Sequence, residues 1–356
     1  MRSRLRGPSL IAIAILTGCD HTEPFQPPDY GAPPPPAGVE TRFTYNLGRD
    51  QSPAWLPDGS GFYYARERTD RPDRDWCLAL MPAAGGAIRN EICDVLPAAA
   101  DSTDAWQAPG PGPGGRIGWV RATSFAPFFA LAPYRTELVV GTTADPAGAR
   151  VLRVLPALTP SGRPWEMASQ IRWLGPGSIV FLAERVAYQG VGQGAADTLR
   201  WGEEIVRAEL DSSPPILTTL PGSDQASSVT VSGPDTVFYT TNGDSRVYRL
   251  VLSTGSITTV HDFGSAGIAR DVQVAGGRLL AVVGGDVSFY TDSILGPVQR
   301  DGGGVIYLVD LATSSAAPLT GVLELFRHPA LSPAGDRLVA EKISGGTSDI
   351  WAVGLP

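Results

Sequence analysis

The feature that most constrains this chain is a repeated pattern of two short strands joined by a turn that contains glycine and proline. A copy near the start, residues 52–65, reads SPAWLPDGSGFYYA, and one near the end, residues 328–340, reads HPALSPAGDRLVA. In both copies a short strand leads into a Pro-x-Gly turn, whose backbone angles favour these residues, and an apolar strand follows. Such repeats indicate units that stack on their neighbours, because no unit buries its apolar face alone.

Four weaker copies lie between these two, and each consists of two strand-like runs around a turn containing glycine or proline. They span residues 106–120, 170–182, 228–240 and 271–283. A further strand-like run follows each of the six copies, at 76–81, 137–142, 204–210, 246–252, 305–311 and 349–355. An outgoing strand follows in the first five repeats, at 88–95, 150–155, 216–220, 257–260 and 317–319. Each repeat therefore has the strand content of one four-stranded antiparallel blade.

The composition agrees with an all-β protein. The 356 residues include 42 glycines and 32 prolines, which are too many for a helical protein, while 43% hydrophobic residues are ample for a buried core. The sixth repeat has no outgoing strand, and residues 41–47 form an unassigned strand ahead of the first repeat. We therefore expect a six-bladed β-propeller over residues 39–356, in which the N-terminal strand completes the last blade and closes the ring.

The two end copies resemble the P-x-W-S-P-D-G repeat of WD40-like (PD40) propellers of the TolB type. Trp55 and the run Pro57-Asp58-Gly59 match this repeat, whereas Leu56 stands where it has serine and Ala334 where it has aspartate. The resemblance implies a propeller over the repeat region. TolB-type proteins carry an α/β domain ahead of the propeller, for which this sequence has no counterpart, so their partner contacts are not carried over.

The N-terminus predicts an export address. Arg2, Arg4 and Arg6 precede the apolar run 10–16, which has the length of a signal-peptide core and is too short to span a bilayer. The run Leu16-Thr17-Gly18-Cys19 matches the lipobox of bacterial lipoproteins at all four positions. This resemblance implies a signal peptide over 1–18, cleavage before Cys19, and lipid on that cysteine. An ordinary signal peptide followed by an accidental cysteine is the alternative.

Residues 19–38 are expected to form a tether that holds the propeller at a membrane of the bacterial cell envelope, facing the periplasm. The run 24–38 (PFQPPDYGAPPPPAG) is rich in proline and has no apolar periodicity, which favours an extended polyproline II segment. Asp20 resembles an inner-membrane retention signal of enteric bacteria, but this rule does not transfer to other groups, so the choice between inner and outer membrane stays open.

The remaining cysteines, Cys77 and Cys93, are expected to form a disulfide, since disulfides persist in an oxidising compartment. A hairpin centred on Gly85 would place these two residues opposite each other, where the Cα separation suits a disulfide. Two free buried thiols are the alternative.

The predicted binding face carries the loops between the second and third strands of each blade together with the connections between blades. Four of these loops are long, at 67–75, 121–135, 184–201 and 289–304, and long loops are often functional. Candidate binding residues around the channel mouth are Gln51, Asp104, Gln170, Asp224, Arg270, Asp271, Arg327 and His328, and the candidate aromatic residues are Phe128, Tyr188, Trp201 and Tyr290. The aromatics could instead pack beneath their own loops.

Several function classes are disfavoured. A net charge of -8 and a pI near 5.0 argue against nucleic acid. With only three histidines and no Gly-x-Ser-x-Gly motif, we expect no enzyme, no metal and no cofactor. Asp70, Asp73 and Asp75 could hold calcium, but the arginines between them favour a solvated loop.

The leading hypothesis is a monomeric, nonenzymatic scaffold that binds an envelope protein or glycan through its long-loop face. The alternative is a glycan-binding or carbohydrate-active propeller that uses the aromatics with Asp104, Asp224 and Asp271, and paired carboxylates across the channel mouth would favour it. A calcium-dependent hydrolase or lyase is the third possibility.

Overall fold

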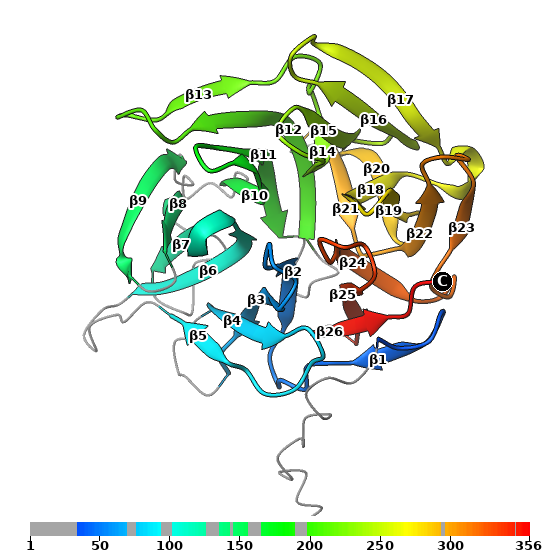
Figure 1. Cartoon of the computed structure of the whole chain (residues 1–356), viewed down its shortest axis with the longest axis horizontal. Helices are drawn as coiled ribbons and strands as arrows, with labels where there is room; N and C mark the ends of the chain where they lie inside the picture. Colours follow the sequence, from blue (N-terminus) through cyan, green and yellow to red (C-terminus); the bar gives the residue numbers. More distant parts are fainter. Residues whose placement is uncertain are drawn as a thin grey trace, which may run out of the picture.

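The computed structural model describes residues 34–69, 76–93, 102–125, 135–142, 145–155, 165–188, 198–292, 296–345 and 347–356. These residues form a ring of six blades (Figure 1), and each blade is an antiparallel sheet of four strands. The structure thus confirms the all-β, six-bladed propeller. Within the described ranges, no helical segment is long and apolar enough to cross a membrane.

The blades follow one another in sequence, with the strands of each running from the channel outward. Blade 1 contains β2 (Asp50–Trp55), β3 (Gly61–Glu67), β4 (Trp76–Pro82) and β5 (Asn90–Ile92). Blade 2 contains β6 (Ser102–Pro111), β7 (Arg116–Phe125), β8 (Arg135–Thr142) and β9 (Asp145–Leu155), and blade 3 contains β10 (Trp165–Gly175), β11 (Ser178–Tyr188), β12 (Thr198–Glu209) and β13 (Ile216–Thr219).

The second half of the ring repeats this arrangement. Blade 4 contains β14 (Ala226–Val231), β15 (Thr236–Thr241), β16 (Arg246–Val251) and β17 (Ser256–Asp262). Blade 5 contains β18 (Ala269–Ala275), β19 (Arg278–Val283), β22 (Val305–Asp310) and β23 (Ala316–Pro318). Blade 6 contains β24 (Leu325–Leu331), β25 (Leu338–Ser344), β26 (Thr347–Val353) and the N-terminal β1 (Glu40–Arg42).

The apolar core is divided into six clusters, one at each junction between neighbouring blades. Between blades 1 and 2, for example, Tyr63 and Leu78 pack with Trp106 and Trp119, whose ring centroids lie 5.1 Å apart. Each fully buried side chain of this kind contributes about 1.5–3 kcal/mol. The alternating apolar pattern of the inner strands therefore stabilises the ring blade by blade.

The tryptophan of the repeat links one blade to the preceding one. The indole Nε1 of Trp55 in blade 1 donates to the carbonyl oxygen of Ala330 in blade 6, at 2.8 Å. In the same way, Nε1 of Trp173 in blade 3 donates to the carbonyl oxygen of Gly110 in blade 2, also at 2.8 Å. A large apolar ring with one polar atom suits this place, since it fills the junction and its N–H finds a partner.

The N-terminal strand closes the last blade, as predicted. Its pairing with β26 joins Glu40 to Val353 and Arg42 to Trp351. The strand is shorter than the expected 41–47, because the backbone N–H groups of Phe43 and Thr44 both donate to the carbonyl oxygen of Ile350. The Ile350 N–H in turn donates to Oγ1 of Thr44. A side-chain hydrogen bond therefore replaces the next backbone hydrogen bond of the sheet, and the strand ends there.

The disulfide between Cys77 and Cys93 is also confirmed. The pairs Leu78–Ile92 and Leu80–Asn90 of β4 and β5 set a register that brings the two cysteines opposite each other, with a Cα separation of 4.6 Å. In the chain-entropy model, closing a loop of this size stabilises the fold by about 3 kcal/mol.

The ring has two different faces. We call the side that carries the turns between first and second strands, such as 56–60 and 332–337, the turn face. The opposite side, which we call the loop face, carries the connections between second and third strands and those from blade to blade. Because Glu40 pairs beside Val353, the last residue of β26, the N-terminal segment enters at the turn face. There the Gly38 N–H donates to the Gly354 carbonyl oxygen at 3.1 Å.

In their described parts, two of the expected long loops are regular structure. The segment expected as the loop 289–304 contains a hairpin of β20 (Val287–Asp292) and β21 (Gly296–Asp301), which is inserted between β19 and β22. The described parts of the loop expected at 184–201, which are residues 184–188 and 198–201, extend β11 and β12. The two extensions meet, since β21 pairs with β12 through Leu199–Arg300 and Arg200–Gln299. Blades 3 and 5 are therefore joined across the loop face.

Candidate functional site

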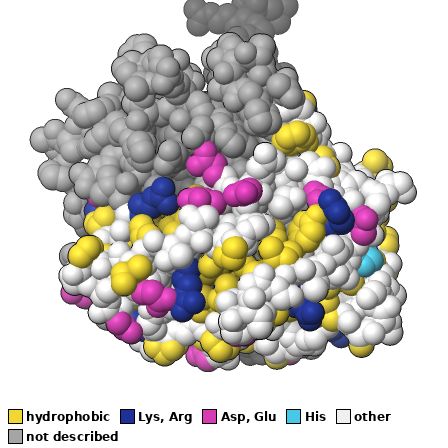
Figure 2. Space-filling model, turned by 90° about the horizontal axis from the view of Figure 1, so that it is seen from above, with side chains coloured by type: hydrophobic (Ala, Val, Ile, Leu, Met, Phe, Trp, Pro, Cys, Tyr) yellow, Lys and Arg dark blue, Asp and Glu magenta, His cyan; other side chains and the backbone are white. Residues whose placement is uncertain are grey.

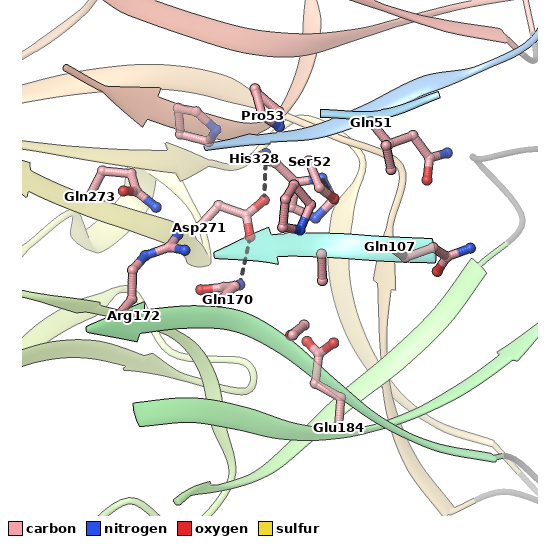
Figure 3. A pocket seen from close by; sticks show the side chains of 15 residues that line it. Gln51, Ser52, Pro53, Gln107, Gln170, Arg172, Glu184, Asp271, Gln273 and His328 are labelled. Atoms are coloured by element: carbon pink, nitrogen blue, oxygen red, sulfur yellow. Dashed lines mark hydrogen bonds between the residues drawn. The ribbon is translucent and has the colours of Figure 1, made fainter. Parts of the chain in front are cut away.

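The candidate site is a cavity in the central channel, lined mainly by the innermost strands of five blades. Its volume is about 60 Å³, and it is partly open to solvent. Glu184 of β11 and Ala65 of β3 add to its wall. Ser169 is one polar residue of this wall, and Figure 3 labels the others, which are Gln51, Ser52, Gln107, Gln170, Arg172, Glu184, Asp271, Gln273 and His328.

A β-bulge at the same place in every inner strand positions these side chains. The register shift of each bulge falls between Gln51 and Ala54 in blade 1, and at the matching positions of the other blades. In five blades the residue at the bulge has a positive φ of 44–53°, and these residues are Ser52, Ala108, Gln170, Asp271 and His328. This conformation is uncommon outside glycine. Bulges turn side chains out of the regular alternation, and here they turn successive residues toward the channel.

Bulge residues link the blades in a partial belt around the channel. The Gln170 side chain accepts from the Val229 N–H at 2.7 Å and donates to Oδ1 of Asp271 at 3.2 Å. Oδ2 of Asp271 accepts from the His328 N–H at 3.1 Å, and Nδ1 of His328 lies 3.4 Å from Oγ of Ser52 (Figure 3). Blades 3, 4, 5, 6 and 1 are thereby connected through side chains of the channel wall.

A fully buried arginine stands behind this belt. Nη2 of Arg270 donates to Oε1 of Glu184 at 3.3 Å, and its Nε lies 3.7 Å from Asp271 and 3.6 Å from Asp301. All four side chains are at most 2% exposed. The three carboxylates hold the pKa of Arg270 above its ordinary value despite burial. Because Asp301 ends β21, this ion cluster also anchors the inserted hairpin to the ring.

A second buried pair lies next to it in blade 6. Arg327 donates through Nη2 to Glu341, and through Nη1 to the carbonyl oxygen of Asp301 at 3.3 Å. Nδ1 of His328 lies 2.8 Å from the other carboxylate oxygen of Glu341. Although burial acts to raise it, the charge of Arg327 and the hydrogen bond from His328 lower the pKa of Glu341 to about 2.

One group of this wall has the composition of a metal site. Asp271, Asp301 and His328 each offer a ligand atom, and these atoms lie within 4.8 Å of one another. However, the guanidinium of Arg270 lies within 3.7 Å of both aspartates and supplies a cation there. An ion-pair network with Arg270 therefore explains why these acidic side chains lie so close together.

The structure distributes the predicted site residues over several places. Gln51, Gln170, Asp271 and His328 line the cavity, while Arg270 and Arg327 lie buried behind it. Asp224 is exposed on the connection from blade 3 to blade 4, and Tyr290 is half-buried on β20. Asp104, Tyr188 and Trp201 are placed on β6, β11 and β12 by their backbone only, and Phe128 lies outside the described residues.

One exposed aromatic of the loop face packs on a neighbouring blade. The ring of Phe289 on β20 lies so close to Gly243, in the β15–β16 turn, that a Cβ there would come within 2.9 Å of it. Nearby, the Gly243 N–H donates to Oε1 of Gln299 at 3.2 Å. The ring of Phe289 therefore packs against the β15–β16 turn of blade 4.

Sequence reasoning did not find Arg172, Gln107, Gln273 and Ser169, all of which line the cavity. A column alignment of the six repeats contains the signal for them. Gln107 and Ser169 occupy the position of Gln51, directly before the bulge residue, and Arg172 and Gln273 both stand two residues after it.

Comparison with known proteins supports the fold. No protein-family model matches the chain, and no curated protein matches it. Among solved structures, TolB from Acinetobacter baumannii is 14% identical with a TM-score of 0.45, and the match covers 86% of this chain and 63% of that one. This chain thus spans less than two thirds of that TolB chain.

Two further solved structures are similar over nearly their whole length. The WD40 repeats of RRP9 are 9% identical with a TM-score of 0.53, over 91% of this chain and 99% of that one. A luciferin-regenerating enzyme is 12% identical with a TM-score of 0.50, over 89% and 95%. Such identities show the fold alone: this chain is a six-bladed β-propeller, and TolB, whose repeat its own repeat resembles, is among its structural neighbours.

Proposed function

We propose that this chain is a lipid-anchored propeller of the bacterial cell envelope that binds a partner protein through its loop face and catalyses no reaction. The observation that carries the proposal is a set of exposed apolar loop tips. Leu323 is 91% exposed, Leu47 88% and Val322 73%, which makes them the most exposed large hydrophobic residues of the described chain. Clustered exposed apolar side chains are typical of protein-binding surfaces.

All three side chains lie on the loop face. Leu47 belongs to the connection from β1 to β2, and Val322 and Leu323 belong to the connection from β23 to β24. These two connections lie on either side of blade 6. A partner that covers both would span blade 6 at the loop face.

The entry point of the chain fits this orientation. The N-terminal segment reaches the ring at the turn face, where Gly38 and Val39 pair with Gly354. A lipid on Cys19 would therefore pull from the side opposite the loop face. The apolar loop tips would then be free to meet a partner in the periplasm.

The carbohydrate-cleaving alternative has less support. The described carboxylates that line the cavity are Glu184 and Asp271, and both are ion-paired with Arg270. A glycosidase needs one carboxyl group as a proton donor and a second as a nucleophile or base. Side chains held by a buried guanidinium are poorly suited to either role.

A cross-linking capture from native envelopes tests the binding surface. The lipidated protein is compared with a loop-face variant, Leu47→Ser with Val322→Ser and Leu323→Ser. The matched control is a rim variant, Ile216→Ser with Leu217→Ser and Ile257→Ser, which changes exposed hydrophobic residues on β13 and β17. Figure 2 shows this rim, where hydrophobic side chains also gather.

We expect the loop-face variant to lose the captured protein and the rim variant to keep it. Capture that survives the loop-face changes, or that is lost equally in both variants, would contradict the proposal. Lipidation is tested separately by Cys19→Ala, which should abolish metabolic labelling with palmitate and move the protein out of the membrane fraction.

A further inference from the structure

The cavity wall contains a second set of polar side chains that take no part in linking the blades. Gln51, Gln107 and Gln273 line the cavity and are partly exposed, and their amide groups form no hydrogen bond with any described residue. Ser169 also lines the cavity, and its buried Oγ has no hydrogen-bond partner among the described residues. Buried polar groups normally have hydrogen-bond partners. These side chains can therefore donate hydrogen bonds to a ligand in the cavity, or accept them from it.

Arg172 stands out within this set. Its Nη1 donates to the carbonyl oxygen of Ile171 at 3.1 Å, and this is its one hydrogen bond to the described chain. No carboxylate oxygen of the described residues lies within 4.0 Å of its guanidinium, whereas Arg270 and Arg327 are paired with acids. Figure 3 shows the Arg172 guanidinium pointing toward the space beside Asp271 and Gln273.

The carboxylates nearest to the cavity are already engaged. Both oxygens of Asp271 accept hydrogen bonds, from Gln170 and from the His328 N–H, and Glu184 accepts from Arg270. Burial lowers the pKa of Arg172 to about 10, and the charge of Asp271 opposes this effect only in part. A guanidinium held partly away from water without an acid gains from an anionic partner.

We propose that the channel cavity binds a small polar ligand through a carboxylate group that pairs with Arg172. The neighbouring amides of Gln51, Gln107 and Gln273 would bond its other polar atoms. Two nitrogens of a guanidinium match the two oxygens of a carboxylate, which makes this pair selective as well as strong. The inference rests on the proposed function, because it adds a small-ligand site in the channel to the loop face that binds the partner protein.

An acidic sugar and the carboxyl end of a peptide would both present this group. The experiment therefore uses two matched pairs of probes: glucuronate with glucose, and a tripeptide with a free carboxyl end with the same tripeptide amidated. Binding to the full-length protein is measured by calorimetry and by ligand-observed NMR. A preference within the first pair would identify a uronate, and a preference within the second a peptide end.

We expect an acidic member of one pair to bind at least about tenfold more tightly than its neutral partner, which corresponds to one charge-assisted contact. Arg172→Gln should remove this preference, and Arg172→Lys should keep part of it. The control is Arg249→Gln, an exposed arginine on β16 whose loss should change nothing. If Arg172→Gln fails to fold, Gln273→Ala should still weaken the acidic probe about threefold.

Equal binding of acidic and neutral probes would overturn the inference, as would full binding by Arg172→Gln, or no binding of either acid at about 10 mM. The loop-face variant separates this result from the proposed function, since it leaves the cavity intact. If that variant loses the partner protein but binds the acidic probe, both proposals stand. If partner capture works while no acid binds, the carboxylate site alone is wrong.

Discussion

Two regions of one channel wall use the same kinds of side chain in opposite ways. The first consists of Gln170, Asp271 and His328, together with the buried Arg270 behind them, and its polar groups are bonded to neighbouring blades. The second consists of Gln107, Arg172 and Gln273, whose polar groups face the cavity without described side-chain partners. Each region contains a glutamine and an arginine. Gln170 and Arg270 of the first region differ from Gln107 and Arg172 of the second in their surroundings, not in their chemistry.

For all of these residues except Arg270, the difference follows from the position of each residue in the bulge. Gln170, Asp271 and His328 are bulge residues with positive φ, and their side chains reach the backbone or a side chain of the next blade. Gln107 stands one residue earlier, and Arg172 and Gln273 stand two residues later. We infer that the bulge position stabilises the ring. The flanking positions do so only where a buried arginine pairs with acids, as Arg270 and Arg327 do, and elsewhere they face the cavity.

The largest effects on stability are expected when a buried arginine of the channel wall is replaced, and Arg327→Met is one such change. This change leaves Glu341 buried without the charge that lowers its pKa to about 2. Removing one partner of a buried ion pair costs about 3–5 kcal/mol. Urea unfolding at pH 7 measures the loss, and a loss below about 1 kcal/mol would show that the Arg327–Glu341 pair does not stabilise the ring.

Asp50 tests whether a buried polar side chain always stabilises the ring. It is fully buried, but its Oδ2 has no hydrogen-bond partner in the described chain, and burial raises its pKa to about 7. Between its ordinary pKa near 3.8 and 7, the unfolded chain ionises before the folded protein does. Stability is therefore highest below this window, falls as pH rises through it, and stays constant above it.

The change Asp50→Asn removes this dependence. We expect the variant to gain on the wild type by up to about 1.4 kcal/mol for each pH unit within the window. Thermal melting from pH 4 to pH 8 measures the difference. Parallel pH profiles of the two proteins would show that Asp50 is ionised in the folded state.

A smaller loss is expected for Asp271→Ala, which removes two acceptors of the belt. The Gln170 amide and the His328 N–H would each lose a bond in the channel wall. The expected cost is about 1–3 kcal/mol, because the donors remain partly buried. Urea unfolding and hydrogen exchange at the His328 amide measure it, and unchanged protection of that amide would contradict the role of Asp271.

The smallest effect is expected for Gln273→Ala. This amide bonds to no described residue, so its removal should change the unfolding free energy by less than about 0.5 kcal/mol. A loss as large as that of Asp271→Ala would mean that the cavity-facing amides also hold the ring together.

The fold could be predicted because its signals are local. Each pair of inner strands is marked by glycine, proline or aspartate in a turn of a few residues, and the Cys77–Cys93 register follows from a short hairpin. The hairpin of β20 and β21 was expected as a loop, because it is inserted between the second and third strands of blade 5, where the repeat has only a connection, and its contact with β12 joins residues about a hundred positions apart. Pairing over such a distance leaves no local pattern in the sequence.

The candidate site was predicted only in part. Gln51, Gln170, Asp271 and His328 were found because blade entries lie around a channel mouth. The bulge was not found, because the repeat has no glycine there, and residues such as Ala108 and Gln170 rarely adopt a positive φ. Without the bulge, the position two residues after it cannot be assigned to the cavity, and Arg172 and Gln273 were missed for this reason.

The most direct test compares Arg172→Met with Arg270→Met. Both changes remove a guanidinium from the same channel wall and replace it with a side chain of similar length. The free energy of unfolding and the binding of the acidic probe are measured for each variant. We predict that Arg270→Met loses about 3–5 kcal/mol, since Glu184, Asp271 and Asp301 remain buried without it. Arg172→Met should keep its stability and lose the acidic probe, and an equal loss of stability in both variants would contradict the division of the channel wall.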